Sequence, residues 1–125
     1  MKLLLDTHVL LWWFIRPKKL SPRVRKMIGD GRQSVWFSAC SVWEMEIKSA
    51  LGQLEVPDDL LEVAGESRFT ELPVTSVHAL ELRNLPMLHN DPFDRLLVAQ
   101  ARAEGLTIVT VDEKVAAYPI STILA

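Results

Sequence analysis

The stretch "LLLDTHVLLWWF", residues 3–14, places an aspartate, a hydroxyl and an imidazole inside an otherwise apolar run. Its first part is too short for a helix, whereas "THVLLWWF" has apolar residues at helical spacing. We therefore expect a strand, then Asp6, then a helix. A carboxylate at such a junction is costly to bury unless it caps the helix or meets a cation.

The alternation of strand and helix continues along the chain. "SVWFSA" (34–39) and "TIVTV" (107–111) are rich in β-branched and aromatic residues, which favours strands; "FTELPV" (69–74) is a weaker strand, and "YPIST" (118–122) an edge strand. Helices are expected over residues 7–14, 22–28, 40–51, 57–64, 75–85 and 92–104. Strands that alternate with helices predict a three-layered α/β fold with a central, mostly parallel sheet.

Length and composition indicate a single globular domain over residues 1–125, because 49% of the residues are hydrophobic and 24% charged. The lone Cys40 excludes an internal disulfide, and the N-terminus lacks the pattern of a signal peptide. The longest apolar stretch, residues 9–15, is far below the roughly 20 residues that span a bilayer. We expect a cytoplasmic protein without a membrane partner.

Charge is unevenly distributed, although the net charge of −2 argues against nucleic-acid binding by bulk charge. One segment is basic without any acid, whereas "EVPDDLLEVAGE" (55–66) is almost purely acidic. The basic residues are Arg16, Lys18, Lys19, Arg23, Arg25 and Lys26. Solvated helix faces explain this pattern, and so does a surface that attracts phosphate.

Five acids stand where strands end or the next helices begin: Asp6, Glu44, Asp91, Asp94 and Asp112. Each has a structural explanation by itself. Asp6 and Asp112 can be N-caps, while "SVWE" (41–44) and "DPFD" (91–94) both have the form of a capping box. Helix capping could therefore account for all five acids.

Capping does not explain why the five acids converge at one edge of a parallel sheet. Carboxylates within a few ångströms repel one another and raise one another's pKa values. A cation relieves that repulsion, and an all-oxygen donor set without Cys or paired His suits a hard ion such as Mg²⁺ or Mn²⁺. The sequence therefore predicts a metal at this edge.

Four stretches resemble the successive signatures of PIN domains and, more narrowly, of VapC-type ribonuclease toxins: "LLLDTHVLLWW", "SACSVWEMEIK", "HNDPFDRLLVAQA" and "TIVTVD". The resemblance runs from the first strand nearly to the C-terminus. It implies a three-layer α/β/α sandwich and an Mg²⁺-dependent endoribonuclease that hydrolyses RNA phosphodiester bonds. It also implies a homodimer and a cognate antitoxin that blocks the enzyme.

Carried over by position, the resemblance implies a catalytic, metal-binding set made of Asp6, Glu44, Asp94 and Asp112. We expect Asp6 and Asp94 to bind the metal directly, and the other two to bind it directly or through water. Thr7 would orient a metal-bound water. Asp91 is additional to the family set, and we interpret it as a cap or as support behind the ligands. No side chain is assigned as the sole general base.

Several alternatives stay open. The basic segment could hold RNA or face the antitoxin. A PIN-like fold could also act as a binding module without turnover. A receiver-type signalling domain is disfavoured, because "FTELPV" and "TIVTVD" do not supply its aspartate and lysine. For His8 and His89 a structural role is favoured over proton transfer, and the four tryptophans are expected to be mostly core.

Overall fold

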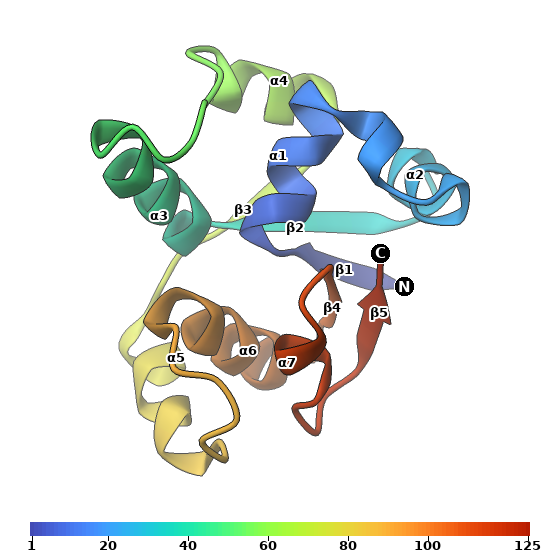
Figure 1. Cartoon of the computed structure of the whole chain (residues 1–125). Coiled ribbons are helices and arrows are strands. Elements are labelled where there is room, and N and C mark those ends of the chain that lie inside the picture. Colours follow the sequence, from blue (N-terminus) through green and yellow to red (C-terminus); the bar gives the residue numbers. More distant parts are fainter.

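The computed structural model describes residues 1–125, and its centre is a five-stranded sheet in the order β3-β2-β1-β4-β5 (Figure 1). The strands are β1 (Lys2–Leu5), β2 (Ser34–Ser38), β3 (Thr70–Leu72), β4 (Thr107–Thr110) and β5 (Thr122–Leu124). Every neighbouring pair is parallel. The predicted α/β class is confirmed, and the sheet is parallel throughout rather than mostly so.

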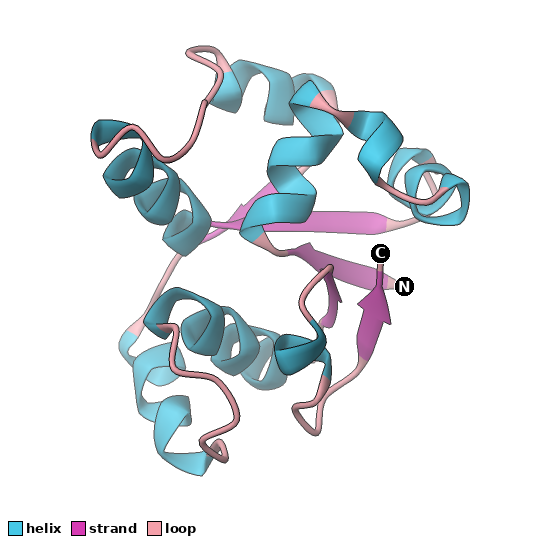
Figure 2. Ribbon diagram, viewed as in Figure 1, coloured by secondary structure: helices cyan, strands magenta, loops and turns pink.

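Helices cover both faces of this sheet (Figure 2). The α-helices are α1 (Thr7–Ile15), α2 (Pro22–Gly29), α3 (Ala39–Ala50), α4 (Leu60–Glu66), α5 (Ser76–Glu81), α6 (Pro92–Glu104) and α7 (Glu113–Ala116); short 3₁₀ segments cover Pro17–Lys19 and Leu82–Asn84. Figure 1 shows α1, α2 and α4 on one side of the strands, with α5, α6 and α7 on the other. The predicted three layers are thus confirmed.

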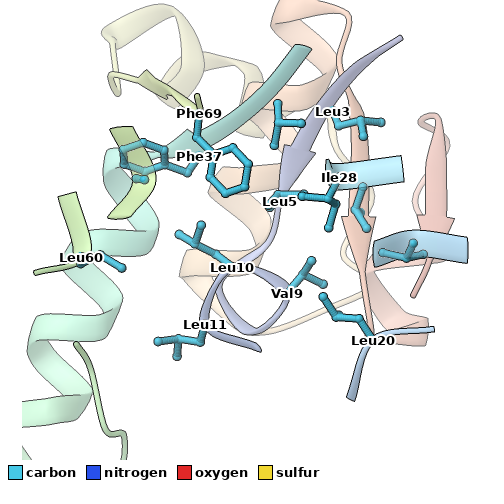
Figure 3. Close-up of a cluster of buried hydrophobic side chains, with 14 of the residues drawn as sticks. Leu3, Leu5, Val9, Leu10, Leu11, Leu20, Ile28, Phe37, Leu60 and Phe69 are labelled. Carbon is cyan, nitrogen blue, oxygen red and sulfur yellow. The ribbon is translucent and has the colours of Figure 1, made fainter. Parts of the chain in front are cut away.

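The central strand β1 supplies apolar side chains to both layers, because successive side chains of a strand point to opposite faces. Leu3 and Leu5 enter one core cluster, which includes Leu10 of α1 and Phe37 of β2 (Figure 3). Leu4 enters the second cluster, with α6 residues such as Leu97. Burial on both faces explains why the strand reads as an unbroken apolar run.

The helix ends differ from the prediction in the middle of the chain. The expected helix over 57–64 begins at Leu60, and the one expected over 75–85 ends at Glu81 and continues as a 3₁₀ turn to Asn84. The predicted end of α6 at Gly105 is confirmed: this residue has φ 66°, a left-handed conformation that glycine adopts without strain. None of the helices combines the length and the apolar character that a bilayer crossing requires.

Candidate metal centre

Asp6 follows β1 directly and is the N-cap of α1, as one of the two interpretations predicted. One carboxylate oxygen, Oδ1, accepts the Val9 N–H at 2.9 Å, and the other, Oδ2, accepts the Thr110 hydroxyl at 2.5 Å. The residue is only 4% exposed, and burial raises the pKa of its carboxyl. Capping therefore uses one oxygen of Asp6, while its other oxygen points towards the end of β4.

Glu44 lies in the second turn of α3, and the capping box predicted for "SVWE" is wrong. Ser38 caps this helix instead, because its hydroxyl accepts the Cys40 N–H at 3.0 Å. Glu44 is 2% exposed; its Oε1 accepts the Thr7 hydroxyl at 2.6 Å, and its Oε2 is paired with the Lys48 ammonium. A buried carboxylate in this position has no capping role.

Asp91 and Asp94 have different roles at the start of α6. Asp91 is the cap, since its Oδ1 accepts the main-chain N–H groups of Phe93 and Asp94 at 2.8 and 3.1 Å. The reciprocal half of a capping box is absent, because the Asp91 N–H donates to Nδ1 of His89 at 3.2 Å. The carboxylate of Asp94 is therefore not used in capping.

The Asp94 carboxyl has an unfavourable environment for a negative charge. Burial, followed by the charges of Asp91, Glu44 and Asp6, raises its pKa to about 7, against a smaller opposing effect of His89. Its side chain is 19% exposed, so this repulsion is only partly screened by solvent. Asp91, Glu44 and Asp6 therefore all disfavour a negative charge on Asp94.

Asp112 follows β4 and caps α7, with Oδ1 accepting the Lys114 N–H at 2.8 Å. Burial disfavours its charge, but the hydrogen bonds from Lys114 and His89 outweigh burial, and the pKa of Asp112 lies below its ordinary value. His89 Nε2 lies 2.9 Å from Asp112 Oδ2 and 3.1 Å from Asp94 Oδ2. These two acids are therefore connected through one imidazole.

Sequence reasoning missed Thr110 as a member of this site, and it did not predict that His89, for which a structural role was favoured, lies between Asp94 and Asp112. The Thr110 hydroxyl donates to Asp6 and accepts the Asp112 N–H at 3.0 Å, so it joins the first acid to the last. A hydroxyl residue at the end of β4, directly before Val111 and Asp112, was the available signal. His89 stands two residues before Asp91, in a loop whose course no periodicity predicts.

Three further predictions concern His8, the basic segment and Trp43. His8, expected to be partly buried, is exposed and lies edge-on to Trp12, with ring centroids 6.2 Å apart. Asp6 and Arg16 are the two caps of α1, whose nine residues span about 14 Å. The basic segment therefore begins at the far end of α1 from the acids. Trp43, expected in the core, is 58% exposed.

The residues present suit a hard divalent cation. The ligand atoms of His89, Asp94 and Asp112 lie within 4.8 Å of one another, and the donors around them are carboxylate oxygens. Asp6 adjoins this group through Thr110, whereas Glu44 is held by Thr7 and Lys48. The buried charge on Asp94, which neighbouring carboxylates oppose, is the feature that a cation would relieve.

A parallel α/β sandwich with carboxylates gathered where its strands end defines the class of this protein. The model of one family, described as "PIN domain", matches residues 3–120. The chain belongs to the PIN domain family, and the resemblance found in the sequence is confirmed.

The chain is also similar to individual proteins. "Ribonuclease VapC22" of Mycobacterium tuberculosis is 29% identical over 121 residues, covering 92% of this chain and 90% of that protein. A VapBC2 complex from Rickettsia felis, bound to a promoter DNA fragment, contains a chain with a TM-score of 0.74 at 14% identity, covering 99% of this chain and 98% of the other. A chain of DNA-bound VapBC from Salmonella typhimurium gives a TM-score of 0.66 at 19% identity, covering 98% of this chain and 97% of the other. The structural matches support the fold.

Proposed function

We propose that this protein is a VapC-type toxin, an endoribonuclease that hydrolyses RNA phosphodiester bonds with Mg²⁺ or Mn²⁺. The observation that carries this proposal is the group formed by Asp94, Asp112 and His89, whose ligand atoms lie within 4.8 Å of one another. Burial and the surrounding acids raise the pKa of Asp94 to about 7. Holding such a group at the end of a parallel sheet is costly for the metal-free protein and useful for one that binds a cation. Membership of the PIN family and similarity to a VapC ribonuclease agree with it.

In the proposed mechanism Asp6 and Asp94 would hold the cation directly. Asp112 and Glu44 contribute directly or through water. The bound ion would lower the pKa of a water molecule and stabilise charge on the scissile phosphate. The protein contributes rigidity: Val9 and Thr110 fix both oxygens of Asp6, while Lys48 and Thr7 fix those of Glu44. Ligands that are held rigidly would keep the geometry in which water can attack the scissile phosphate in line with the leaving oxygen.

Cleavage of RNA by the purified protein tests this proposal. We expect cleavage with Mg²⁺ or Mn²⁺, none with EDTA, and loss of at least a hundredfold in Asp6→Asn and Asp94→Asn, on the order of what removal of an essential electrostatic group costs. Asp58→Asn is the control, because Asp58 is an exposed acid in the loop before α4. Undiminished cleavage in EDTA would refute the mechanism.

The competing role is a PIN-like binding module without turnover. The same assay separates the two roles, since a binding module would retain RNA in a filter-binding experiment and leave it intact with every divalent ion. No feature of the four acids favours that role.

We further propose a cognate antitoxin as partner, because similar folds occur in complexes described as VapBC and FitAB. Homodimerisation has its own support in an exposed apolar face on α3. Trp43, Ile47 and Leu51 are spaced four residues apart and are 58%, 37% and 67% exposed. Exposed apolar patches of this kind mark interaction surfaces. The cytoplasmic location stays a prediction.

A further inference from the structure

His89 occupies an unusual position between two acids from different elements. Its Nε2 is 3.1 Å from Asp94 Oδ2, at the start of α6, and 2.9 Å from Asp112 Oδ2, after β4. The imidazole is 14% exposed, and the main-chain N–H of His89 donates to the Tyr118 hydroxyl at 3.1 Å. The loop is thus anchored at the point where its side chain reaches the two carboxylates.

The tautomer of this imidazole follows from its other nitrogen. The Asp91 main-chain N–H donates to His89 Nδ1 at 3.2 Å, and a main-chain N–H can only donate. Nδ1 therefore offers a lone pair, and the ring proton lies on Nε2, from which it is donated to Asp112 Oδ2. Asp94 Oδ2 lies 3.1 Å from the same nitrogen without forming a hydrogen bond to it.

This tautomer argues against His89 as a metal ligand. Neighbouring ligand atoms of an octahedral ion lie about 3 Å apart. The distances from Nε2 to the two carboxylates would therefore by themselves allow His89 to bind the metal. A ligating imidazole, however, normally donates its second N–H to a carboxylate or carbonyl, which fixes the ring. Here the second nitrogen accepts a hydrogen bond from Asp91 instead.

We propose that His89 is a positioning residue: its Nε2–H donates to Asp112 while Nε2 lies 3.1 Å from Asp94, so that a divalent cation meets a preformed pair of carboxylates. Two ionised carboxylates on separate elements would otherwise repel one another. The imidazole between them keeps the pair together and leaves other lone pairs of each carboxylate available. This inference rests on the proposed metal-dependent function and adds a residue that the acids alone do not indicate.

The affinity for Mn²⁺, measured by calorimetry without RNA, tests the proposal. His89→Leu should bind Mn²⁺ about 10- to 100-fold more weakly, which is the usual effect of losing a group that orients ligands. His89→Gln should stay within about threefold of the unaltered protein, because its amide N–H can replace Nε2–H. Unchanged affinity in His89→Leu would overturn the proposal, and so would a Gln variant as weak as the Leu variant.

Two measurements on the unaltered protein keep the proposal falsifiable if His89→Leu does not fold. Nitrogen NMR of the metal-free protein should show the His89 proton on Nε2, and pulsed electron paramagnetic resonance of bound Mn²⁺ should show no imidazole nitrogen coupling. A proton on Nδ1 would contradict the proposal, and so would a nitrogen coupling that disappears in His89→Gln. Mn²⁺ binding without RNA cleavage would refute only the proposed function, whereas no Mn²⁺ binding would overturn both.

Discussion

At the residue scale, Asp91 and Asp94 show how two acids three positions apart separate into different tasks. The carboxylate of Asp91 is directed at main-chain N–H groups, and that of Asp94 is directed at His89. The sequence pattern "DPFD" treats them as partners in one capping box. The structure separates them because His89 Nδ1 takes the N–H that a reciprocal capping bond would need.

Serine substitutions distinguish the two roles. Asp91→Ser should keep most stability and most cleavage, because serine caps helices nearly as well as aspartate. Asp94→Ser should lose Mg²⁺ binding and cleavage together, because it removes an anionic oxygen ligand. Calorimetric Mg²⁺ affinity and RNA cleavage are measured for both. Equal losses would mean that Asp91 also binds the metal, and full activity in Asp94→Ser would refute its assignment.

The raised pKa of Asp94 predicts how the stability of the metal-free protein depends on pH. The folded state keeps a proton on Asp94 up to about pH 7, whereas the unfolded chain loses it near 3.8. The free energy of unfolding should therefore fall as pH rises between these values, by about 2 kcal/mol or more, because a tenfold difference in proton affinity corresponds to roughly 1.4 kcal/mol. Asp94→Asn should reduce this dependence. The check is urea unfolding in EDTA at pH 5 and pH 8, and an equal pH dependence in the variant would contradict the prediction.

At the scale of elements, the sequence predicted the strands and helix ends that depend on the local pattern of residues. The central strands β1 and β4 bury successive residues on both faces, and Ser21-Pro22 and Gly105 mark helix ends by their own backbone chemistry. The capping box "SVWE" failed because α3 begins at Ala39 with Ser38 as its N-cap, whereas the motif places the cap at Ser41. His89 could not be found this way, because its role depends on where α6 and β4 bring two distant carboxylates.

Gln100 connects α6 to the strands beneath it. It is fully buried; its Oε1 accepts the Ser38 hydroxyl at 2.5 Å, and its Nε2 donates to the Pro73 carbonyl at 3.3 Å. Gln100→Leu should lower the free energy of unfolding by about 1–3 kcal/mol, since it leaves buried groups without partners. Arg102→Gln, which breaks a part-exposed pair with Glu81, should cost less than about 1 kcal/mol. Chemical denaturation measures the free energy of unfolding of both variants. An equal loss in Gln100→Leu and Arg102→Gln would refute the argument that the buried contacts of Gln100 contribute more than the part-exposed ion pair.

At the scale of the whole molecule, the acids and the basic segment lie at opposite ends of α1, and RNA must reach both if both are used. Replacing Arg23, Arg25 and Lys26 with Gln should weaken RNA binding and flatten its salt dependence by up to about 0.7 per lost phosphate contact on a single strand. Mg²⁺ affinity should barely change. Normal RNA binding combined with escape from a co-purified antitoxin would assign the segment to that partner instead.

The apolar face of α3 leads to a prediction about assembly. Ile47→Asp should shift the protein towards the monomer at micromolar concentration, because it places a charge in the centre of the Trp43–Leu51 face. Glu46→Gln is the control, on an exposed neighbouring position. Sedimentation velocity reports the mass, and an unchanged dimer in Ile47→Asp would place the interface elsewhere.

The hydrogen bond from Thr110 to Asp6 joins residues 104 positions apart. The ribosome makes β1 long before β4, yet the two strands pair in parallel. A chain still being translated can hold Asp6, Glu44 and Asp94 but has neither Thr110 nor Asp112. If the proposed ribonuclease needs all four acids, it becomes competent only after Asp112 has been added to the growing chain.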